Sequence, residues 1–282
     1  MSEQNKQVCS ILVSSLDMYE DVWKAFFTLF FRYWPDCPYQ VYLMTNTKEY
    51  QDARVTSIKV GGDKIWSINI KRALPYITTP YLIFFLEDFF LERKVDTDYI
   101  KKLVAFAESE KAACIHLSPF EPPKAEYPND LGLGLINKDA EYRTSLRTAI
   151  WNKDIFESLI KEGESAWDME REGTVRSKEL DAPFLSVKEP AIKIHSLASV
   201  RGGKWLYDSI KILGKEGIHI DLSKRAVDYE GKWRSVFDHL RKNSFAQGIR
   251  RIPVLGKALS WLYWRLSFLK VNKIFNRKNS RV

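Results

Sequence analysis

An almost unbroken apolar run at residues 81–86 (YLIFFL) ends abruptly in two adjacent acids, Glu87 and Asp88. The run lacks polar alternation, is rich in residues that favour strands and follows Pro80, so it predicts a strand that is covered on both faces. Carboxylates beside such a strand are costly unless they are solvated or bound, and open α/β sheets bind ligands outside the carboxyl ends of their strands. The pair therefore predicts a site for a divalent cation that carries a diphosphate, with a simple turn cap as the alternative.

Apolar periodicity and turn residues divide the rest of the chain into alternating elements. They predict strands at 8–13, 40–44, 55–60, 112–117, 131–136, 148–151 and 191–195, and helices at 17–34, 65–74, 97–109, 154–161 and 205–213. Asp17 and Glu20 have the spacing of a capping box for the first helix, and Gly214 is expected to end the last one. The order strand, helix, strand, strand predicts an α/β fold with a doubly wound mixed sheet and flanking helices. The Pro-rich segment 118–130 is expected to be a long loop, of the kind that forms lids or binds acceptors.

The composition is that of a globular chain. Its 282 residues are 45% apolar and 13% aromatic, which is enough to bury a sizeable core. No run of about 18 uncharged apolar residues is present, and the polar start MSEQNKQ lacks the apolar region of a signal peptide, so a cytoplasmic protein that does not span a membrane is expected. Cys9, Cys37 and Cys114 lack metal-site spacing and are expected to be reduced thiols.

Polar residues at other predicted strand ends extend the candidate nucleotide site. Ser15 and Asp17 leave the first strand, and Asn46 follows the second. The helix after the third strand carries Lys71 and Arg72 toward the same sheet edge, where these cations could meet a diphosphate. An ordinary solvated helix face is the alternative for these two residues.

A basic loop, ASVRGGKW, follows the last predicted strand. Arg201 and Lys204, together with the backbone of the two glycines between them, could hold phosphate oxygens. His195 lies between that strand and this loop and is a candidate metal ligand beside Glu87 and Asp88. A lone histidine is, however, more often a satisfied core or surface residue.

The segment GESAWDMEREG places Trp167, Asp168 and Glu170 between glycines, near the start of a short helix. An aromatic ring beside a carboxylate is a common way to hold a sugar and to remove a hydroxyl proton. Two acids that are two residues apart on a helix point differently, so at most one is expected to face a substrate. Asp168 is preferred because it directly follows Trp167. The alternative is an exposed helix start that is rich in acids because they suit the helix dipole.

Together, the strand order, the opening VSSLDMYEDVW, the strand end LEDFFL and the segment SLRTAIWNKDIF…WDMEREG resemble the GT-A class of nucleotide-sugar glycosyltransferases over residues 8–205. The bacterial surface-polysaccharide enzymes of that class are the most similar. In that family an Asp-any-Asp motif binds a divalent metal, Mn²⁺ or Mg²⁺, and the nucleotide diphosphate, while a later acid deprotonates the acceptor in inverting members. By position, Glu87 and Asp88 match the metal motif, and Asp168 or Glu170 matches the base. The acids here are adjacent, and Phe89 stands two residues after Glu87.

The resemblance implies an inverting glycosyltransferase that uses a nucleotide-diphosphate sugar and a glycan or lipid-linked glycan acceptor in surface-polysaccharide synthesis. A sugar-phosphate nucleotidyltransferase has a similar sheet and stays open as an alternative. It should, however, show a glycine-rich basic signature after the first strand, which residues 14–17 lack. A nucleic-acid-binding module would explain a basic tail but not the acidic strand end, so no nucleic-acid partner is expected.

Residues 234–282 are predicted to be a basic helical tail after a catalytic domain at 1–233. The tail carries twelve Lys/Arg against one Asp, whereas the residues before it carry 32 Lys/Arg against 35 Asp/Glu. Beyond Pro253 a helical wheel gives two opposite apolar stripes, one of leucines and one rich in aromatics. The aromatic stripe with its basic neighbours is typical of a helix that lies on an anionic membrane, so a peripheral location at the inner face of the cell membrane is expected. A C-terminal core helix with a solvated basic edge is the alternative.

Full-length protein is therefore expected to sediment with anionic liposomes, and less so at high salt, because each basic residue near an anionic leaflet contributes about 1 kcal/mol. Truncation near Arg234 should release the protein from the liposomes while donor hydrolysis stays measurable. Co-sedimentation of both forms measures this effect. Equal partitioning of the full-length and truncated proteins would refute a membrane role for the tail.

Overall fold

A computed structural model describes residues 7–62, 64–119, 121–195 and 198–229, and the predicted tail at 234–282 lies outside these ranges. The chain divides into two units, Met1–Trp205 with Ser209–Ala226, and Leu206–Asp208 with Val227–Val282. The described part of the second unit contains β12 (Val227–Asp228) and a contact between the rings of Tyr207 and Tyr229, whose centroids lie 5.9 Å apart. The first unit contains the sheet described next.

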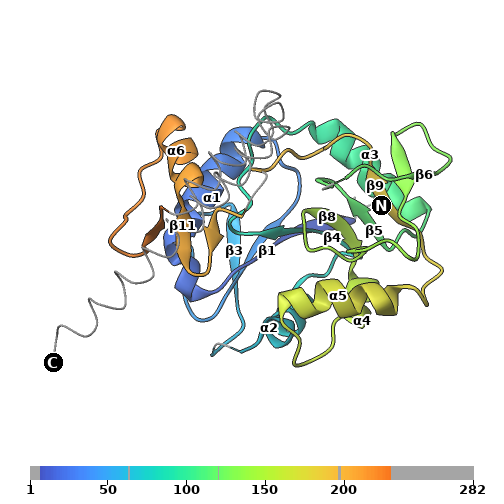
Figure 1. Cartoon of the computed structure of the whole chain (residues 1–282), viewed down its shortest axis with the longest axis horizontal. Helices are drawn as coiled ribbons and strands as arrows, with labels where there is room; N and C mark the ends of the chain where they lie inside the picture. The colour runs from blue at the N-terminus through green and yellow to red at the C-terminus, as the bar shows by residue number, and fades with distance from the viewer. Residues whose placement is uncertain (1–6, 63, 120, 196–197, 230–282) are drawn as a thin grey trace, which may run out of the picture. The chain divides into compact units, whose positions relative to one another are not determined.

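A nine-stranded mixed sheet forms the centre of the first unit, in the order β3-β2-β1-β4-β8-β5-β9-β7-β6. Four adjacent strands form a parallel block: β1 (Cys9–Ser14), β2 (Val41–Thr45), β3 (Val55–Lys59) and β4 (Tyr81–Leu86). Beyond them, β8 (Ala149–Asn152) is antiparallel to both β4 and β5 (Cys114–His116). The sheet continues with β9 (Phe184–Val187), β7 (Leu133–Leu135) and β6 (Ala125–Glu126). For the described residues, the predicted α/β class with a mixed sheet is confirmed (Figure 1).

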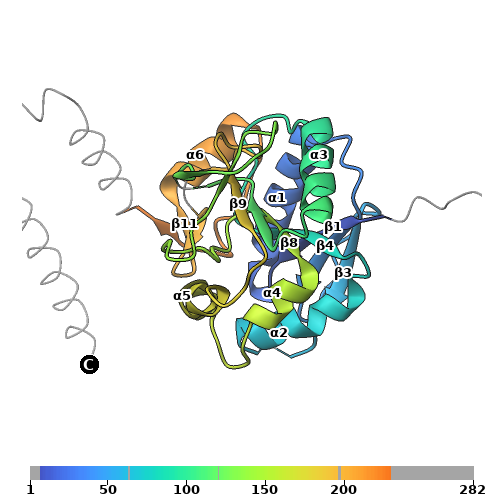
Figure 2. The ribbon, with the colours of Figure 1, turned by 90° about the vertical axis from the view of Figure 1, so that its right-hand side faces the viewer.

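Helices cover both faces of the sheet (Figures 1 and 2). One face carries α1 (Glu20–Tyr33) and α3 (Thr97–Ser109), and the other carries α2 (Trp66–Ala73), α4 (Lys153–Leu159) and α5 (Ala166–Ser177). Short 3₁₀ turns occur at η1 (Asp17–Tyr19) and η2 (Leu74–Tyr76), and the chain continues through β10 (Val200–Arg201), β11 (Lys204–Leu206) and α6 (Tyr207–Lys215). Helices on both faces and the four adjacent parallel strands β3-β2-β1-β4 make the sheet doubly wound, as predicted.

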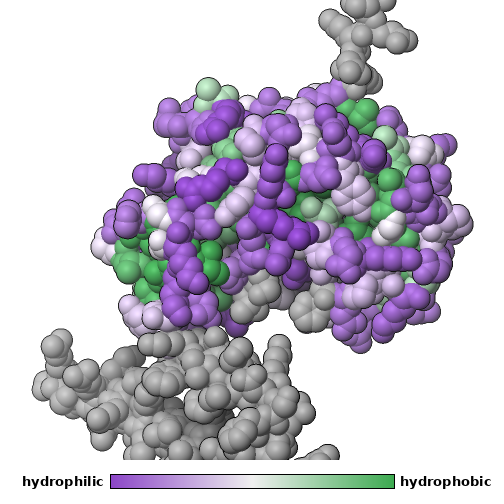
Figure 3. Space-filling model, turned by 90° about the horizontal axis from the view of Figure 1, so that it is seen from above, coloured by the Kyte–Doolittle hydropathy of each residue, from purple (hydrophilic) through white to green (hydrophobic). Residues whose placement is uncertain are grey.

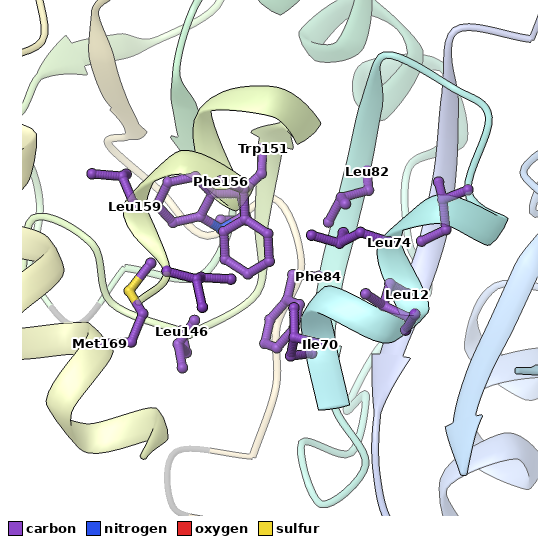
Figure 4. Close-up of a cluster of buried hydrophobic side chains, with 14 of the residues drawn as sticks. Leu12, Ile70, Leu74, Leu82, Phe84, Leu146, Trp151, Phe156, Leu159 and Met169 are labelled. Carbon is purple, nitrogen blue, oxygen red and sulfur yellow. The ribbon is translucent and has the colours of Figure 1, made fainter. Parts of the chain in front are cut away.

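The side chains of β4 alternate between the two faces, and both faces are packed. Leu82 and Phe84 join a buried cluster that includes residues of α2, α4 and α5 (Figure 4). Phe85 faces the other way and contacts α1 edge-on, with its ring centroid 6.0 Å from that of Phe26 and 5.8 Å from that of Phe30. The apolar run at 81–86 is therefore a strand covered on both sides, as its composition predicts.

The structure corrects two predicted elements. Residues 191–195 do not form a strand, because Ile194 makes only an isolated bridge with Leu91. The strand that pairs with β5 is instead β9, which lies earlier in the sequence. The helix predicted at 205–213 begins at Tyr207 because Trp205 belongs to β11, and Gly214 lies inside this helix. Gly217, with a φ of 69°, follows the helix instead, in a conformation that glycine adopts without strain.

The surface seen in Figure 3 is mostly hydrophilic, with smaller apolar areas between the polar side chains. Within the part of the chain that the structure describes, no helix is long and apolar enough to cross a membrane. The predicted loop at 118–130 contains β6, which pairs with β7 and extends the sheet.

Candidate functional site

The order of the strands changes direction between β1 and β4. The chain runs from β1 outward to β2 and β3 and then places β4 on the other side of β1. Because β1 and β4 are parallel, with Ser14 paired to Leu86, the segments that leave them emerge at the same sheet edge. Ligands of open α/β sheets bind outside the carboxyl ends of the strands at such a switch point. Ser15 after β1, and Glu87 with Asp88 after β4, occupy this position.

Glu87 and Asp88 are buried at this edge, with only 7% and 8% of their surfaces exposed. Burial raises the pKa of Asp88 to about 6, although the Val200 backbone N–H donates to its Oδ2 over 3.2 Å. Burial and the neighbouring Asp88 carboxyl raise the pKa of Glu87 well above its ordinary value, and the positive charge of Arg225 opposes this rise. Two adjacent desolvated carboxyls are thus held where a cation or a proton must compensate their charge.

Ser15, Asp17 and Asn46 are brought together, and their side chains hold the loops at this edge. The Asp17 carboxylate accepts hydrogen bonds from the backbone N–H groups of Asn46 (2.9 Å) and Thr47 (3.0 Å) and from the Thr47 hydroxyl (2.7 Å). Asn46 Oδ1 accepts in turn from the Asp17 N–H (3.0 Å), and Trp23 Nε1 donates to Ser15 Oγ (2.7 Å). Burial opposes ionisation of Asp17, but the Thr47 hydrogen bonds prevail and lower its pKa. Asp17 is therefore not the predicted cap of α1, because its carboxylate binds the loop after β2.

Lys71 and Arg72 lie in the last turn of α2. Arg72 Nη1 donates to the Val60 carbonyl over 3.1 Å, directly beyond the end of β3. Since β2 separates β3 from β1, this contact places the Arg72 side chain at the outer part of the edge. A contact between either cation and a diphosphate stays a prediction.

The predicted phosphate loop is the turn of a β-hairpin. Gly202–Gly203 has φ values of 54° and 72°, as a two-residue type I′ turn requires. Arg201 and Lys204 are paired across the hairpin, and both are exposed. The Val200 N–H, at the base of the hairpin, donates a hydrogen bond to the Asp88 carboxylate. This contact attaches the hairpin that carries Arg201 and Lys204 to the acidic strand end.

Arg225 is a residue of this site that sequence reasoning missed. It is 7% exposed and forms a bidentate ion pair with Asp21 over 2.9 and 2.8 Å, and its charge acts on Glu87. Asp21 and Arg225 are 204 residues apart, so no local signal pairs them.

Glu170 reaches the same sheet edge through the loop before β8. Because β8 is antiparallel to β4, with Ala149 beside Phe84, the residues before Ala149 lie at the carboxyl end of β4. Glu170 Oε1 accepts from the Leu146 N–H (2.7 Å) and from the Ser145 hydroxyl (3.1 Å). Among the described residues no hydrogen bond reaches Glu170 Oε2.

Asp168 caps the start of α5. Its Oδ2 accepts from the Ser165 hydroxyl (2.6 Å) and N–H (3.0 Å) in a reciprocal capping box, and its Oδ1 accepts from Arg171 (2.7 Å). The hydrogen bonds from Ser165 and Arg171 lower the pKa of Asp168. This is the helix-start arrangement given above as the alternative to a catalytic role. Trp167, beside it, is 73% exposed.

Arg147 is a further cation at this edge that the sequence did not single out. Its Nε donates to the carbonyl of Ser118, two residues after the end of β5, over 2.6 Å. Burial lowers the pKa of Arg147, and the charge of Glu170 acts against this shift. The Arg147 guanidinium thus lies near enough to the Glu170 carboxylate to interact with its charge.

His195 is buried, and its Nδ1 has no hydrogen-bond partner in the part of the chain that the structure describes. Its backbone N–H donates to the Phe90 carbonyl over 2.9 Å, beside the segment that follows the acidic pair. Across the described residues, no group of three or more His, Cys, Asp or Glu side chains is arranged to hold a metal ion. Glu87 and Asp88 offer two hard oxygen ligands of the kind that Mg²⁺ prefers, and the metal and its third ligand, His195, stay predictions.

No protein-family model and no curated protein matches the chain. Among solved structures, S. aureus TarS 1–349 in complex with UDP-GlcNAc is 11% identical, with 77% of this chain and 68% of that chain covered and a TM-score of 0.43. The bifunctional IspDF from Campylobacter jejuni is 11% identical, with coverages of 68% and 52% and a TM-score of 0.41. A UDP-glucose pyrophosphorylase complexed with UDP-glucose is 10% identical, with coverages of 74% and 100% and a TM-score of 0.41.

In another structure of TarS 1–349 the match spans 59% of that chain, with a TM-score of 0.45. Likenesses at this level of identity and TM-score assign neither a family nor a reaction to this chain.

Replacing Asp88 by Asn is expected to stabilise the fold at pH 8 and to have little effect at pH 4. The folded-state pKa of about 6 lies above the ordinary 3.8, so the folded state binds the proton more tightly and stability falls as the pH rises through this interval. Asn removes the charge and can still accept from the Val200 N–H, so a gain of about 1–3 kcal/mol is expected at pH 8. Chemical denaturation at both pH values measures it. Asp98→Asn on the exposed surface of α3 is the control, and an equal effect of Asp88→Asn at both pH values would contradict the assignment.

Proposed function

We propose that this chain is a glycosyltransferase that moves a sugar from a nucleotide-diphosphate sugar to a hydroxyl of a glycan or lipid-linked glycan in surface-polysaccharide synthesis. The observation that carries the proposal is the buried pair Glu87 and Asp88 at the switch point of a doubly wound sheet, with Glu170 anchored at the same edge. A nucleotide diphosphate needs charge compensation, and an acceptor hydroxyl needs a base. This edge offers residues for both tasks.

On the donor side, Glu87 and Asp88 would hold a divalent cation, Mn²⁺ or Mg²⁺, whose remaining ligands would come from diphosphate oxygens and water. When bound, such a cation would act as a Lewis acid toward the diphosphate. Arg201 and Lys204 would bind phosphate oxygens and stabilise the charge that develops on the leaving group. The hydrogen bond from Val200 to Asp88 supports this role, because it holds the hairpin that carries both residues at the acidic strand end.

On the acceptor side, Glu170 is the candidate general base. Hydrogen bonds from Leu146 and Ser145 fix its Oε1, so that Oε2 can take the acceptor proton. The acceptor oxygen attacks the anomeric carbon from the face opposite the diphosphate. As the new C–O bond forms, the bond to the diphosphate oxygen breaks, and its electron pair leaves with the diphosphate, so the configuration inverts. The exposed ring of Trp167 would stack on the acceptor sugar.

The acceptor and the location belong to the same proposal. A lipid-linked acceptor lies at a membrane surface, and the basic aromatic sequence at 234–282 is typical of a segment that binds anionic lipid. A cytoplasmic enzyme held at the inner face of the cell membrane would meet both a soluble donor and such an acceptor.

A panel of nucleotide sugars, incubated with and without Mn²⁺ or Mg²⁺, tests the reaction. We expect slow release of a nucleoside diphosphate from one donor, and we expect Asp88→Asn to reduce it on the order of 10²-fold or more, because a charge-stabilising group is lost. Glu92→Gln, an exposed acid in the same segment, is the control. Pyrophosphate release from a nucleoside triphosphate and a sugar phosphate would instead indicate a nucleotidyltransferase. Near-normal activity of Asp88→Asn would end the assignment of this carboxylate.

Glu170→Gln is expected to lower turnover about 10²- to 10⁴-fold while donor binding persists, as expected when a general base is removed. Asp168→Asn is the matched comparison, because Asp168 is an acid on the same helix whose carboxylate forms the capping box with Ser165. It should affect thermal stability more than turnover. Steady-state kinetics and donor titration separate these effects. If Asp168→Asn shows the larger loss of turnover, the base is Asp168; if both variants keep wild-type turnover, the base lies elsewhere or the configuration is retained.

A further inference from the structure

The hairpin of β10 and β11 is fixed at its base to the acidic strand end. The N–H of Ser199 donates to the Asp88 carbonyl and the N–H of Val200 to the Asp88 carboxylate, each over 3.2 Å. Trp205 in β11 is fully buried, with its ring centroid 6.3 Å from that of Phe90. The base is thus held by hydrogen bonds and packing, and the tip needs an attachment of its own.

Arg225 provides that attachment. Its Nη1 donates to the Gly203 carbonyl in the turn (3.2 Å), and its Nη2 donates to the Met18 carbonyl before α1 (2.7 Å). The same guanidinium pairs with both carboxylate oxygens of Asp21 in the first turn of α1, over 2.9 and 2.8 Å, and lies 4.9 Å from the centre of the Tyr19 ring. The Arg225 and Asp21 side chains are only 6% and 9% exposed. One side chain therefore joins the hairpin turn to the loop after β1 and to α1.

Two positive charges flank the turn of the hairpin and repel each other. Arg201 and Lys204 lie directly opposite each other, and like charges at opposed positions repel. No ion pair involves either residue within the described ranges. The contacts of Arg225, rather than those of the hairpin alone, therefore keep the turn beside the start of α1.

We propose that Arg225 is a positioning residue that latches the β10–β11 hairpin to the start of α1 and so holds Arg201 and Lys204 where they meet the donor diphosphate. The identity of that ligand rests on the proposed function, whereas the latch does not. Lysine is a poor replacement, because an ammonium lacks the planar fork that binds one carboxylate through two nitrogens and two carbonyls at the same time.

Limited proteolysis tests the latch without any substrate. Trypsin cuts after Arg201 and after Lys204, so mass spectrometry of these two cuts reports how often the tip opens. Arg225→Lys is expected to raise their rate about ten-fold or more, because local opening becomes easier while the rest of the unit stays folded. Arg32→Lys is the matched control, because Arg32 pairs with Glu216 (2.7 Å) and also joins α1 to the C-terminal part of the unit, but it does not contact the hairpin.

If Arg225→Lys does not fold, Asp21→Asn allows the same comparison, since it removes the charge that holds the guanidinium. Cleavage in the turn at the wild-type rate in the folded variant would overturn the latch. A rise of the same size in Arg32→Lys would also overturn it, because the effect would then not be specific to the hairpin.

Inorganic pyrophosphate probes the second half of the proposal by calorimetry. We expect Arg225→Lys to weaken its binding about ten-fold, and to have no further effect when Arg201 and Lys204 are already Ala, because nothing is then left to position. Additive losses would overturn the positioning role. If wild-type protein binds neither pyrophosphate nor any nucleotide sugar while turn cleavage still rises in Arg225→Lys, the donor assignment fails and the latch stands.

Discussion

Burial of β4 is the constraint on which the candidate site depends. The strand pairs with β1 on one side and β8 on the other, and its alternate side chains pack under helices on both faces of the sheet. A slip of one residue would move Phe84 and Phe85 to opposite faces, so the register is strongly fixed. Glu87 and Asp88 therefore emerge at a defined place, directly after six residues that cannot shift.

That fixed position is unfavourable for the acids themselves. Both carboxyls are desolvated, each raises the cost of ionising the other, and the nearby guanidinium of Arg225 is already paired with Asp21. A site that served only the fold would favour neutral or apolar residues here. Retained charge at a strand end is the kind of local conflict that occurs where a ligand supplies the missing compensation.

Local patterns were sufficient to predict β1, β4, α1 and α3, because each has a run or period of apolar residues that matches its burial. They could not show which acid of α5 faces the sheet edge. Glu170 is anchored by Leu146, which lies 24 residues earlier in the sequence, whereas Asp168 is held by Ser165 in its own turn. The pairing of Asp21 with Arg225 is likewise decided by tertiary packing.

The other misses arose because a local signal was ambiguous, absent or misleading. The two glycines between Arg201 and Lys204 are flanked by residues that favour strands, which is a hairpin signature, although phosphate binding by a loop also uses glycines. The strand β9 has only four residues and no alternation of polar and apolar side chains, so its sequence does not distinguish it from a loop. Asp17 and Glu20 have capping-box spacing by chance, since the loop after β2 offers the Asp17 carboxylate a larger set of N–H donors.

The reversed direction of β8 has a consequence for how such a protein can diversify. Because this strand runs against its neighbours, the loop that precedes it, rather than the one that follows, lies at the carboxyl end of β4 and carries the anchor of Glu170. The loop before β8 and the α5 residue that it anchors, which the proposed function assigns to the acceptor, are thus separate in sequence from the segments at 14–17, 46–48 and 87–88. Under the proposed function, insertions in the loop before β8 or substitutions at the exposed start of α5 could therefore change the acceptor, while β8 keeps its pairing with β4 and the donor side is untouched.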